Sequence, residues 1–383
     1  MTESNDRPLL FTPIRLRGIE LKNRVVISPM CQYSARAGIV QDWHMVHLGQ
    51  FATGGAGLIF TEATAVEERG RITHGDAGLW LDDQIAPFRR ITDFLKANGA
   101  VPGIQLAHAG RKGATRPPWQ GGAALDASDA AHGLPPWETV APSALRYDPS
   151  GPLPRALHTE EIPALLDAWR NAARRAREAG FEIVEIHGAH GYLIHEFLSG
   201  TSNKRTDTYG GSLAGRMRFI LEVAERVRGE WPQDNPVFVR LSVVDDADPD
   251  WTFDSTLTLI AALKERGVDI IDCSTGGIGK AGFAIRGRYV PGYQVDMAGK
   301  VRRATSIGVM AVGLITHGRQ AEKILRNEQA DLVAVGREAL ADPHWALHAA
   351  AELGVDPEFA AWPPQYGWWL AYRARALASR KSG

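Results

Sequence analysis

Residues 181–192 read Phe-Glu-Ile-Val-Glu-Ile-His-Gly-Ala-His-Gly-Tyr. The first half is rich in β-branched and aromatic residues, which is typical of a buried strand. The second half carries His187, His190 and Tyr192 within six residues, with glycines between them. A strand that runs into a glycine-containing turn with clustered proton donors indicates an active site at a strand end of an α/β protein.

Short apolar runs alternate with helical patterns along the chain. Eight of these runs are almost continuously apolar, as expected for strands buried on both faces of a parallel sheet. They cover residues 25–28, 57–61, 101–106, 183–187, 237–241, 269–274, 309–313 and 332–336. Eight strands alternating with helices predict a (β/α)8 barrel (TIM barrel) of class α/β, with a doubly wound open sheet as the alternative.

Helices are predicted between the strands. One is expected to begin with Thr159 as its N-cap, to bury a face that includes Trp169, and to end near Gly180. Another is expected to begin at Ser212 and to bury Met217 and its neighbours at helical spacing. Further helices are predicted at 82–98, 254–267, 295–307 and 318–327.

Two segments depart from the repeat, although residues 1–383 are expected to form one domain. Residues 109–158 are rich in Gly, Pro and Trp and separate the third strand from the fourth. A connection of that length is expected to be a functional lid or an added subdomain. The tail, residues 356–383, contains many aromatic residues, which predicts docking onto the barrel or onto a neighbouring molecule.

The composition limits the possible partners. The chain of 383 residues has a net charge of -1 and no long basic run, so nothing points to nucleic acid or an anionic membrane. The two cysteines are too few for an iron–sulfur cluster with four Cys ligands. The polar N-terminus and the absence of an apolar run of membrane-spanning length predict a cytoplasmic protein.

The ends of the last two strands carry Gly313, Gly336 and Arg337. The corresponding loops of many barrels bind phosphate, because glycine lets backbone N–H groups approach an anion and a guanidinium adds a bidentate contact. The alternative is that the glycines only form tight turns.

Arg240 and Gln105 lie in apolar strands, where an unpaired polar group is costly. One planar, polar ligand such as a flavin could pair with both side chains. The alternative is that each pairs with a protein carboxylate or a backbone carbonyl.

The histidines also allow more than one interpretation. His-x-x-His is a common metal-ligand spacing, but no convincing third ligand is visible. A pair of N–H donors that polarises a carbonyl, with Tyr192 as a proton donor, fits as well. The remaining alternative is that these side chains only pack the loop.

Cys31 and Tyr33 could likewise be packing residues only, and Cys273 is expected to lie in the core.

Several short motifs occur in a fixed order along almost the whole chain. They are Lys22-Asn23-Arg24, Ser28-Pro29-Met30-Cys31, Glu62-Ala63-Thr64, Gln105-Leu106-Ala107-His108-Ala109-Gly110-Arg111, His187–Tyr192, Asn203–Asp207 with Tyr209–Ser212, Pro291-Gly292-Tyr293-Gln294 and Gly336-Arg337-Glu338. In this order they resemble the Old Yellow Enzyme family of FMN-dependent ene-reductases. Cys31 with Tyr33, and His187 with His190, resemble its bacterial thermophilic-like subgroup, the NADPH dehydrogenase and xenobiotic reductase type.

The resemblance implies that FMN lies across the barrel mouth. Two sets of residues would hold it. The isoalloxazine would be held by Ser28, Pro29, Met30, Cys31, Ala63, Gln105 and Arg240, and the phosphate by Gly313, Gly336 and Arg337. Cys31 would lie near the reactive edge of the flavin and tune its redox behaviour.

The resemblance also implies a ping-pong reaction. NADPH, or NADH, would reduce FMN at N5, and the hydride would then pass to the β-carbon of an α,β-unsaturated carbonyl or nitro compound. His187 and His190 would bind the activating oxygen of that alkene. Tyr33 would assist them, and Tyr192 would protonate the α-carbon.

One departure from the subgroup concerns the tail. Some members have an Arg after the C-terminal Gln-Tyr that reaches a neighbour's active site, whereas Gln365-Tyr366 is followed here by Gly367-Trp368-Trp369. Trp368 or Trp369 is therefore expected to form an aromatic wall of the substrate site, from its own chain or across the interface of a homodimer or homotetramer. The alternative is packing in the core.

Overall fold

The computed structural model describes residues 7–279 and 290–381, so most of the polar N-terminus considered above lies outside it. The eight predicted strands are all present. They are β3 (Val25–Ile27), β4 (Leu58–Ala65), β5 (Val101–Ala107), β8 (Ile183–Gly188), β9 (Val237–Ser242), β10 (Ile270–Ser274), β11 (Gly308–Ala311) and β12 (Leu332–Val335).

These strands form a closed barrel in the order β10-β11-β12-β3-β4-β5-β8-β9, and neighbouring strands are parallel. Val333 of β12 pairs with Val25 of β3, which joins the last barrel strand in the chain to the first. The predicted TIM barrel is therefore confirmed, and the open sheet is wrong.

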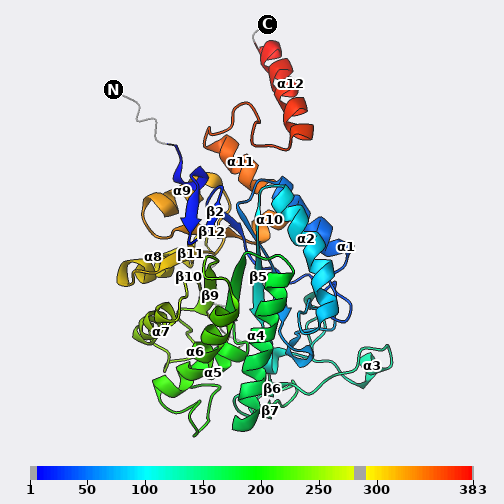
Figure 1. Cartoon of the computed structure of the whole chain (residues 1–383), viewed down its shortest axis with the longest axis vertical. Helices are drawn as coiled ribbons and strands as arrows, with labels where there is room; N and C mark the ends of the chain where they lie inside the picture. The colour runs from blue at the N-terminus through cyan, green and yellow to red at the C-terminus, as the bar shows by residue number, and fades with distance from the viewer. Residues whose placement is uncertain (1–6, 280–289, 382–383) are drawn as a thin grey trace.

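Helices cover the outside of the barrel (Figure 1). The helices are α1 (Asp42–Thr53), α2 (Ile85–Ala97), α3 (Ala127–Ala130), α4 (Ile162–Glu178), α5 (Leu193–Leu198), α6 (Leu213–Glu230), α7 (Phe253–Glu265), α8 (Val295–Ala304), α9 (Gly318–Arg326), α10 (Arg337–Ala341), α11 (Trp345–Glu352) and α12 (Pro364–Lys381). Among them, none combines the length and the apolar content needed to cross a lipid bilayer.

Two predicted helix starts can be compared with the structure. Ser212 caps α6, because its hydroxyl accepts the N–H of Gly215, as predicted. Thr159 does not cap α4, because a 3-10 turn of residues 159–161 precedes Ile162 and the Thr159 hydroxyl donates to Asp207 instead. The predicted buried face of α4, including Trp169, is confirmed.

A β-hairpin closes the amino-terminal end of the barrel. Its strands are β1 (Ile14–Leu16) and β2 (Ile19–Leu21), and Leu21 joins a buried cluster inside the barrel that includes Phe60 and Phe238. A second and larger cluster lies between the strands and the helices and contains Cys273, as predicted. Because the hairpin occupies this end, the site lies at the other end, where the strands finish.

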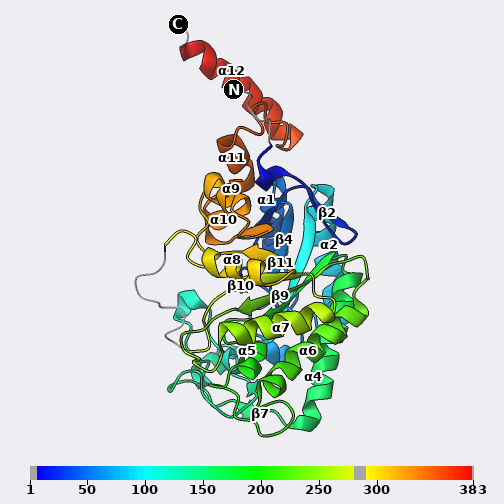
Figure 2. The same ribbon diagram turned by 90° about the vertical axis from the view of Figure 1, so that its left-hand side faces the viewer.

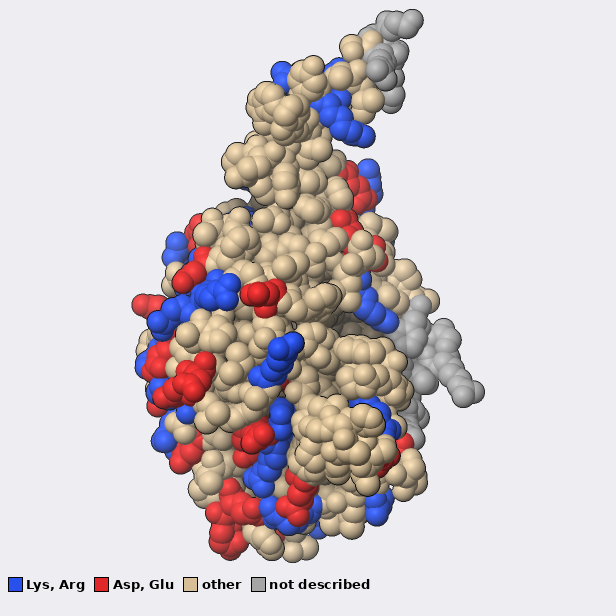
Figure 3. Space-filling model, turned by 90° about the vertical axis from the view of Figure 1, so that its right-hand side faces the viewer, with Lys and Arg blue, Asp and Glu red and all other residues tan. Residues whose placement is uncertain are grey.

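The C-terminal helix α12 projects away from the barrel beyond α11, which both ribbon views show (Figures 1 and 2). The side chains of Trp368 and Trp369 are 62% and 63% exposed. The start of the tail contacts the body of the chain, because Trp362 stacks on His344 with ring centroids 5.3 Å apart. Trp368 and Trp369 do not, so packing of these two residues in the core is wrong. On the face drawn in Figure 3, acidic and basic side chains are interspersed over the body of the molecule.

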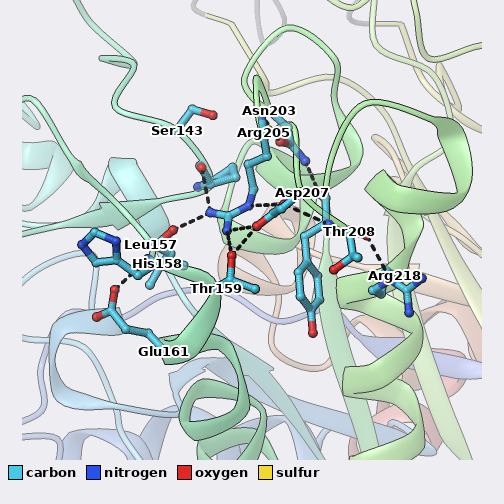
Figure 4. Close-up of polar contacts among 12 residues, drawn as sticks. Ser143, Leu157, His158, Thr159, Glu161, Asn203, Arg205, Asp207, Thr208 and Arg218 are labelled. Atoms are coloured by element: carbon cyan, nitrogen blue, oxygen red, sulfur yellow. Dashed lines mark hydrogen bonds and ion pairs between the residues drawn. The ribbon is translucent and has the colours of Figure 1, made fainter.

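The segment 109–158 leaves the barrel after β5 and contains α3 and the short parallel pair β6 (Val140–Ala141) and β7 (Arg155–Ala156). The guanidinium of Arg205, in the loop after α5, binds the C-terminal part of this segment (Figure 4). Arg205 donates to the carbonyl oxygens of Pro142 and Leu157 and forms a two-point ion pair with Asp207. This interaction gives the Asn203–Asp207 motif a structural role.

We expect Asp207→Asn to destabilise the protein by about 2–3 kcal/mol at pH 7, because the largely buried Arg205 would lose its charged partner. Hydrogen bonds from Arg205 hold the pKa of Asp207 well below its usual range. The ion pair therefore contributes fully to the free energy of unfolding above about pH 3.9, the ordinary pKa of Asp. This contribution is lost as the pH falls toward the lower pKa that Asp207 has in the folded protein.

Urea unfolding at several pH values checks this expectation. The difference between wild type and Asp207→Asn should decrease below about pH 4. Asp93→Asn, at an exposed position of α2, is the control and should have little effect. A pH-independent difference at Asp207 would contradict the electrostatic explanation.

Candidate active site

A cavity of about 440 Å³ opens at the carboxyl ends of the strands. Most of the residues that line it come from strand ends or the loops that follow them. They include Ser28, Met30, His190, Arg240, Ser274, Gly313, Gly336 and Arg337. The fold thus brings together residues predicted for the isoalloxazine, for the phosphate and for the substrate.

A layer of polar side chains lies inside the barrel below this cavity. Arg240 Nε lies 3.0 Å from Asp272 Oδ2, and Gln105 Nε2 donates to Glu185 Oε1 at 2.8 Å. Each of the two side chains therefore has a carboxyl group of the protein as a partner, and Arg240 also lines the cavity. Burial, reinforced by the negative charge of Asp272, raises the pKa of Glu185 to about 8. Burial also raises the pKa of Asp272, and the Arg240 guanidinium opposes the rise in both carboxyl groups.

The cavity has the chemistry that FMN requires. Arg240 also donates to Ser28 Oγ (3.3 Å), which places its guanidinium at the cavity wall. Gly336 leaves its backbone accessible, because a Cβ added there would meet no atom closer than 3.9 Å. Gly313 has a φ of +121°, a conformation that requires glycine. Exposed Arg337 adds a second cation at the rim, so the residues fit a planar cofactor that carries a phosphate.

The remaining cofactor residues predicted from the sequence lie close by. Pro29 is half-buried between Ser28 and Met30, and Ala63 is buried and lines a small space beside Tyr192. Cys31 is half-buried, and burial raises the pKa of its thiol well above the usual range. A thiol at this position is therefore protonated at neutral pH and is a weak nucleophile.

His187, near the end of β8, and His190, in the turn after β8, contact each other. His187 Nε2 and His190 Nδ1 are 3.4 Å apart. The other nitrogens have separate partners, because the Ala189 N–H donates to His187 Nδ1 and the Ser274 hydroxyl lies 2.6 Å from His190 Nε2. Burial lowers the pKa of both imidazoles well below the usual range, so both are neutral at pH 7.

A chain of hydrogen bonds sets the protons on the two imidazoles. His187 Nδ1 accepts the Ala189 N–H, so His187 carries its proton on Nε2 and donates it to His190 Nδ1. His190 then carries its proton on Nε2 and donates it to Ser274 Oγ, which also accepts from Gln294 Nε2 (3.2 Å). One of the two nitrogens that face each other therefore carries a proton and the other accepts it.

Two tyrosines complete the cluster. The ring of Tyr192 lies 5.1 Å from that of His187, and burial raises the pKa of both Tyr192 and Tyr33. Tyr33 has a left-handed φ of 49°, a strained conformation that is most common at functional sites. The loop that carries Tyr33 is held by Glu62, which accepts the N–H of Gln32 at 2.8 Å.

The segment 109–158 covers a second cavity, of about 1020 Å³. Tyr33 and Tyr192 line its barrel side, and Lys112 and Tyr147 from the segment line it as well. His190 lines the first cavity, and Tyr33 and Tyr192 line the second. The histidine and tyrosine cluster therefore borders both cavities.

Trp368 and Trp369 line neither cavity, so the expected aromatic wall is wrong for the chain's own site. They lie on α12, which projects beyond the barrel (Figure 2). Within residues 7–279 and 290–381, no group of three His, Cys, Asp or Glu side chains is arranged to hold a metal ion. Sequence reasoning missed Ser274 and Lys112, although Ser274 ends a predicted strand and Lys112 directly follows the Gln105–Arg111 motif.

Comparison with known proteins identifies the family. Residues 9–355 match the family described as NADH:flavin oxidoreductase / NADH oxidase, whose model is named for FMN. The chain belongs to this family. It is 44% identical to an NADPH dehydrogenase of Geobacillus sp. (strain WCH70) over 349 residues, which is 91% of this chain and 95% of that protein.

Solved structures agree with this assignment. Morphinone reductase is 28% identical, with a TM-score of 0.73 and 91% of each chain covered. A 2-naphthoyl-CoA reductase is 25% identical, with a TM-score of 0.81 over 90% of this chain, and this chain spans 52% of that longer protein. The resemblance to the Old Yellow Enzyme family is confirmed. The protein is an FMN-dependent oxidoreductase that uses a nicotinamide reductant.

We expect ¹⁵N NMR of the imidazole nitrogens to show His190 protonated on Nε2. Ser274→Ala removes the hydroxyl that accepts from Nε2, so the Nδ1–H form should become populated. Ser242→Ala is the matched control, because the Ser242 hydroxyl accepts the backbone N–H of His190 at 3.1 Å and does not contact its ring. An Nδ1–H tautomer in the wild type would show that the assignment is wrong.

Proposed function

We propose that this oxidoreductase reduces the activated C=C bond of α,β-unsaturated carbonyl or nitro compounds. The observation that supports this proposal is the placement of His187 and His190, whose facing nitrogens are 3.4 Å apart and joined by a hydrogen bond. An oxygen bound beside these nitrogens can accept the hydrogen bond of His187 Nε2–H, and that of His190 when its proton lies on Nδ1. Such donors stabilise the negative charge that develops on a carbonyl or nitro oxygen when hydride adds to the alkene.

Tyr192 is the proposed proton donor. Its ring lies against His187, so an acceptor whose oxygen is bound by the two histidines would present its α-carbon near the phenol. Burial keeps the phenol protonated at neutral pH, which is the form a general acid requires. Tyr33 lines the same cavity as Tyr192 and is proposed to contact the acceptor.

Ser28, Pro29, Met30, Cys31, Ala63, Gln105 and Arg240 are proposed to hold the isoalloxazine, and Gly313, Gly336 and Arg337 the phosphate. When bound, FMN supplies two-electron transfer between the nicotinamide and the acceptor. NADPH is the proposed reductant, because the relative of 44% identity is an NADPH dehydrogenase. The segment 109–158 is proposed to act as a lid that keeps water from the acceptor.

Tyr192→Phe tests the assignment, because it removes the proton donor and keeps the ring. We expect the reduction of cyclohexenone to slow by about 10²- to 10⁴-fold. The oxidation of NADPH by the enzyme in the first half-reaction should change little, because it needs no proton from Tyr192. Stopped-flow measurement separates the two half-reactions.

Two results would count against the proposal. Equal loss in both half-reactions of Tyr192→Phe would assign the tyrosine a structural role. A wild-type enzyme that oxidises NADPH but reduces neither enones nor nitroalkenes would require a different acceptor.

We further propose that the protein is a homo-oligomer held in part by α12. The aromatic face of this helix consists of Tyr366, Trp368, Trp369 and Tyr372, which are 50%, 62%, 63% and 59% exposed. The rings of Trp368 and Trp369 lie 4.5 Å apart, so they form one continuous apolar surface. Large aromatic side chains of this kind are enriched at the centres of protein interfaces.

Replacing both Trp368 and Trp369 by Ala should lower the mass in solution toward that of one chain, 41.7 kDa. Light scattering coupled to gel filtration measures the mass. Val46→Ala is the control, because Val46 is 68% exposed but lies on α1. A change in KM for the acceptor at unchanged mass would show that α12 reaches a neighbour's site without holding the oligomer, whereas no change in either would contradict both roles.

A further inference from the structure

Lys112 places a cation against the proposed proton donor. Its ammonium nitrogen lies 4.9 Å from the centre of the Tyr192 ring and 4.6 Å from that of Tyr147. Lys112 Nζ also donates to the carbonyl oxygen of His190 at 2.8 Å. These contacts fix the ammonium between the segment 109–158 and the turn that carries the histidines, within the range of a cation–π interaction.

The surroundings of Lys112 leave it charged. Burial lowers its pKa to about 8, which is still above neutral pH. At neutral pH most molecules therefore carry an ammonium at this position.

Tyr192, in contrast, has little near it that would favour its anionic form. Burial raises the pKa of the phenol, and Cys31, Asp76 and Tyr147 raise it further. If Tyr192 gives up its proton, a negative charge is left in a buried position, which is costly unless a cation lies close by. The cation that the structure places against the Tyr192 ring is Lys112.

We propose that Lys112 is a positioning residue for proton transfer, whose ammonium stabilises the phenolate that Tyr192 becomes. In that step the O–H bond of Tyr192 breaks, its electron pair stays on the phenol oxygen, and a C–H bond forms at the α-carbon of the enolate left by hydride addition. The negative charge moves from the acceptor to Tyr192, beside Lys112, and water later returns the proton. This inference rests on the proposed function.

The choice of acceptor separates this role from a structural one. An enone needs a proton at its α-carbon for turnover, whereas hydride addition to a nitroalkene gives a nitronate, whose charge rests on oxygen and which can leave unprotonated. We expect Lys112→Met to slow cyclohexenone reduction about 10- to 100-fold and to leave nitroalkene reduction nearly unchanged. Lys112→Arg, which keeps a positive charge, should recover part of the enone activity.

A double-mutant cycle tests whether Lys112 acts through Tyr192. In the Tyr192→Phe background, Lys112→Met should cause no further loss of enone reduction, because no phenolate forms. Lys204→Met is the matched control, because Lys204 is exposed and donates to a backbone carbonyl, that of Gly200. It should leave both acceptors unaffected. Flavin absorbance and circular dichroism verify that each variant is folded, and Lys112→Gln serves for the same comparison if Lys112→Met does not fold.

Two results would overturn the proposal. One is an equal loss with both acceptors in Lys112→Met, and the other is the same additional loss in the Tyr192→Phe background. Either would mean that Lys112 shapes the cavity and does not act on the proton. Failure of the proposed function gives a different result, because the wild type would then reduce neither acceptor, and both proposals would be wrong.

Discussion

The active end of this barrel depends on a layer of buried polar side chains between its strands. Arg240 pairs with Asp272 and Gln105 with Glu185, on strands that are hydrogen-bonded to each other. Charges in a barrel interior are tolerated only when they are paired. Burial raises the pKa of both carboxyl groups, and the Arg240 guanidinium opposes this rise. The two pairs form the floor of the cavity, while Arg240 also lines its wall.

Above this floor, the positions of the protons decide what the site can do. The Ala189 N–H occupies His187 Nδ1, so the remaining N–H of His187 points to His190, and His190 in turn donates to Ser274. Both imidazoles are buried and neutral, so they keep these protons over the physiological pH range. Imidazole N–H groups, a phenol and an ammonium close together are suited to stabilising an anion and then protonating it.

The barrel was predictable because its strands are local apolar runs, such as 237–241, whose pattern indicates burial on both faces. The histidine and tyrosine cluster was predictable because its members are close in sequence. The partners of Arg240 and Gln105 were not, because the choice between ligand and carboxylate depends on strand register. Ser274 and Lys112 were missed because each contacts a residue of the turn after β8 that is distant in sequence. The helix α12 was missed because Pro363 and Pro364 at its start, followed by aromatic residues, resembled an irregular tail.

The guanidinium of Arg205 holds the C-terminal part of the segment 109–158, and the 3-10 turn at Gly110–Lys112 holds its start. The residues between these anchors are largely exposed. Since the entropy of closing a loop grows only slowly with its length, the stretch between the anchors can tolerate insertions and deletions at small cost to the barrel. Loops of other proteins could therefore be grafted into this stretch to change which molecules enter the cavity, while the residues at the strand ends stay in place.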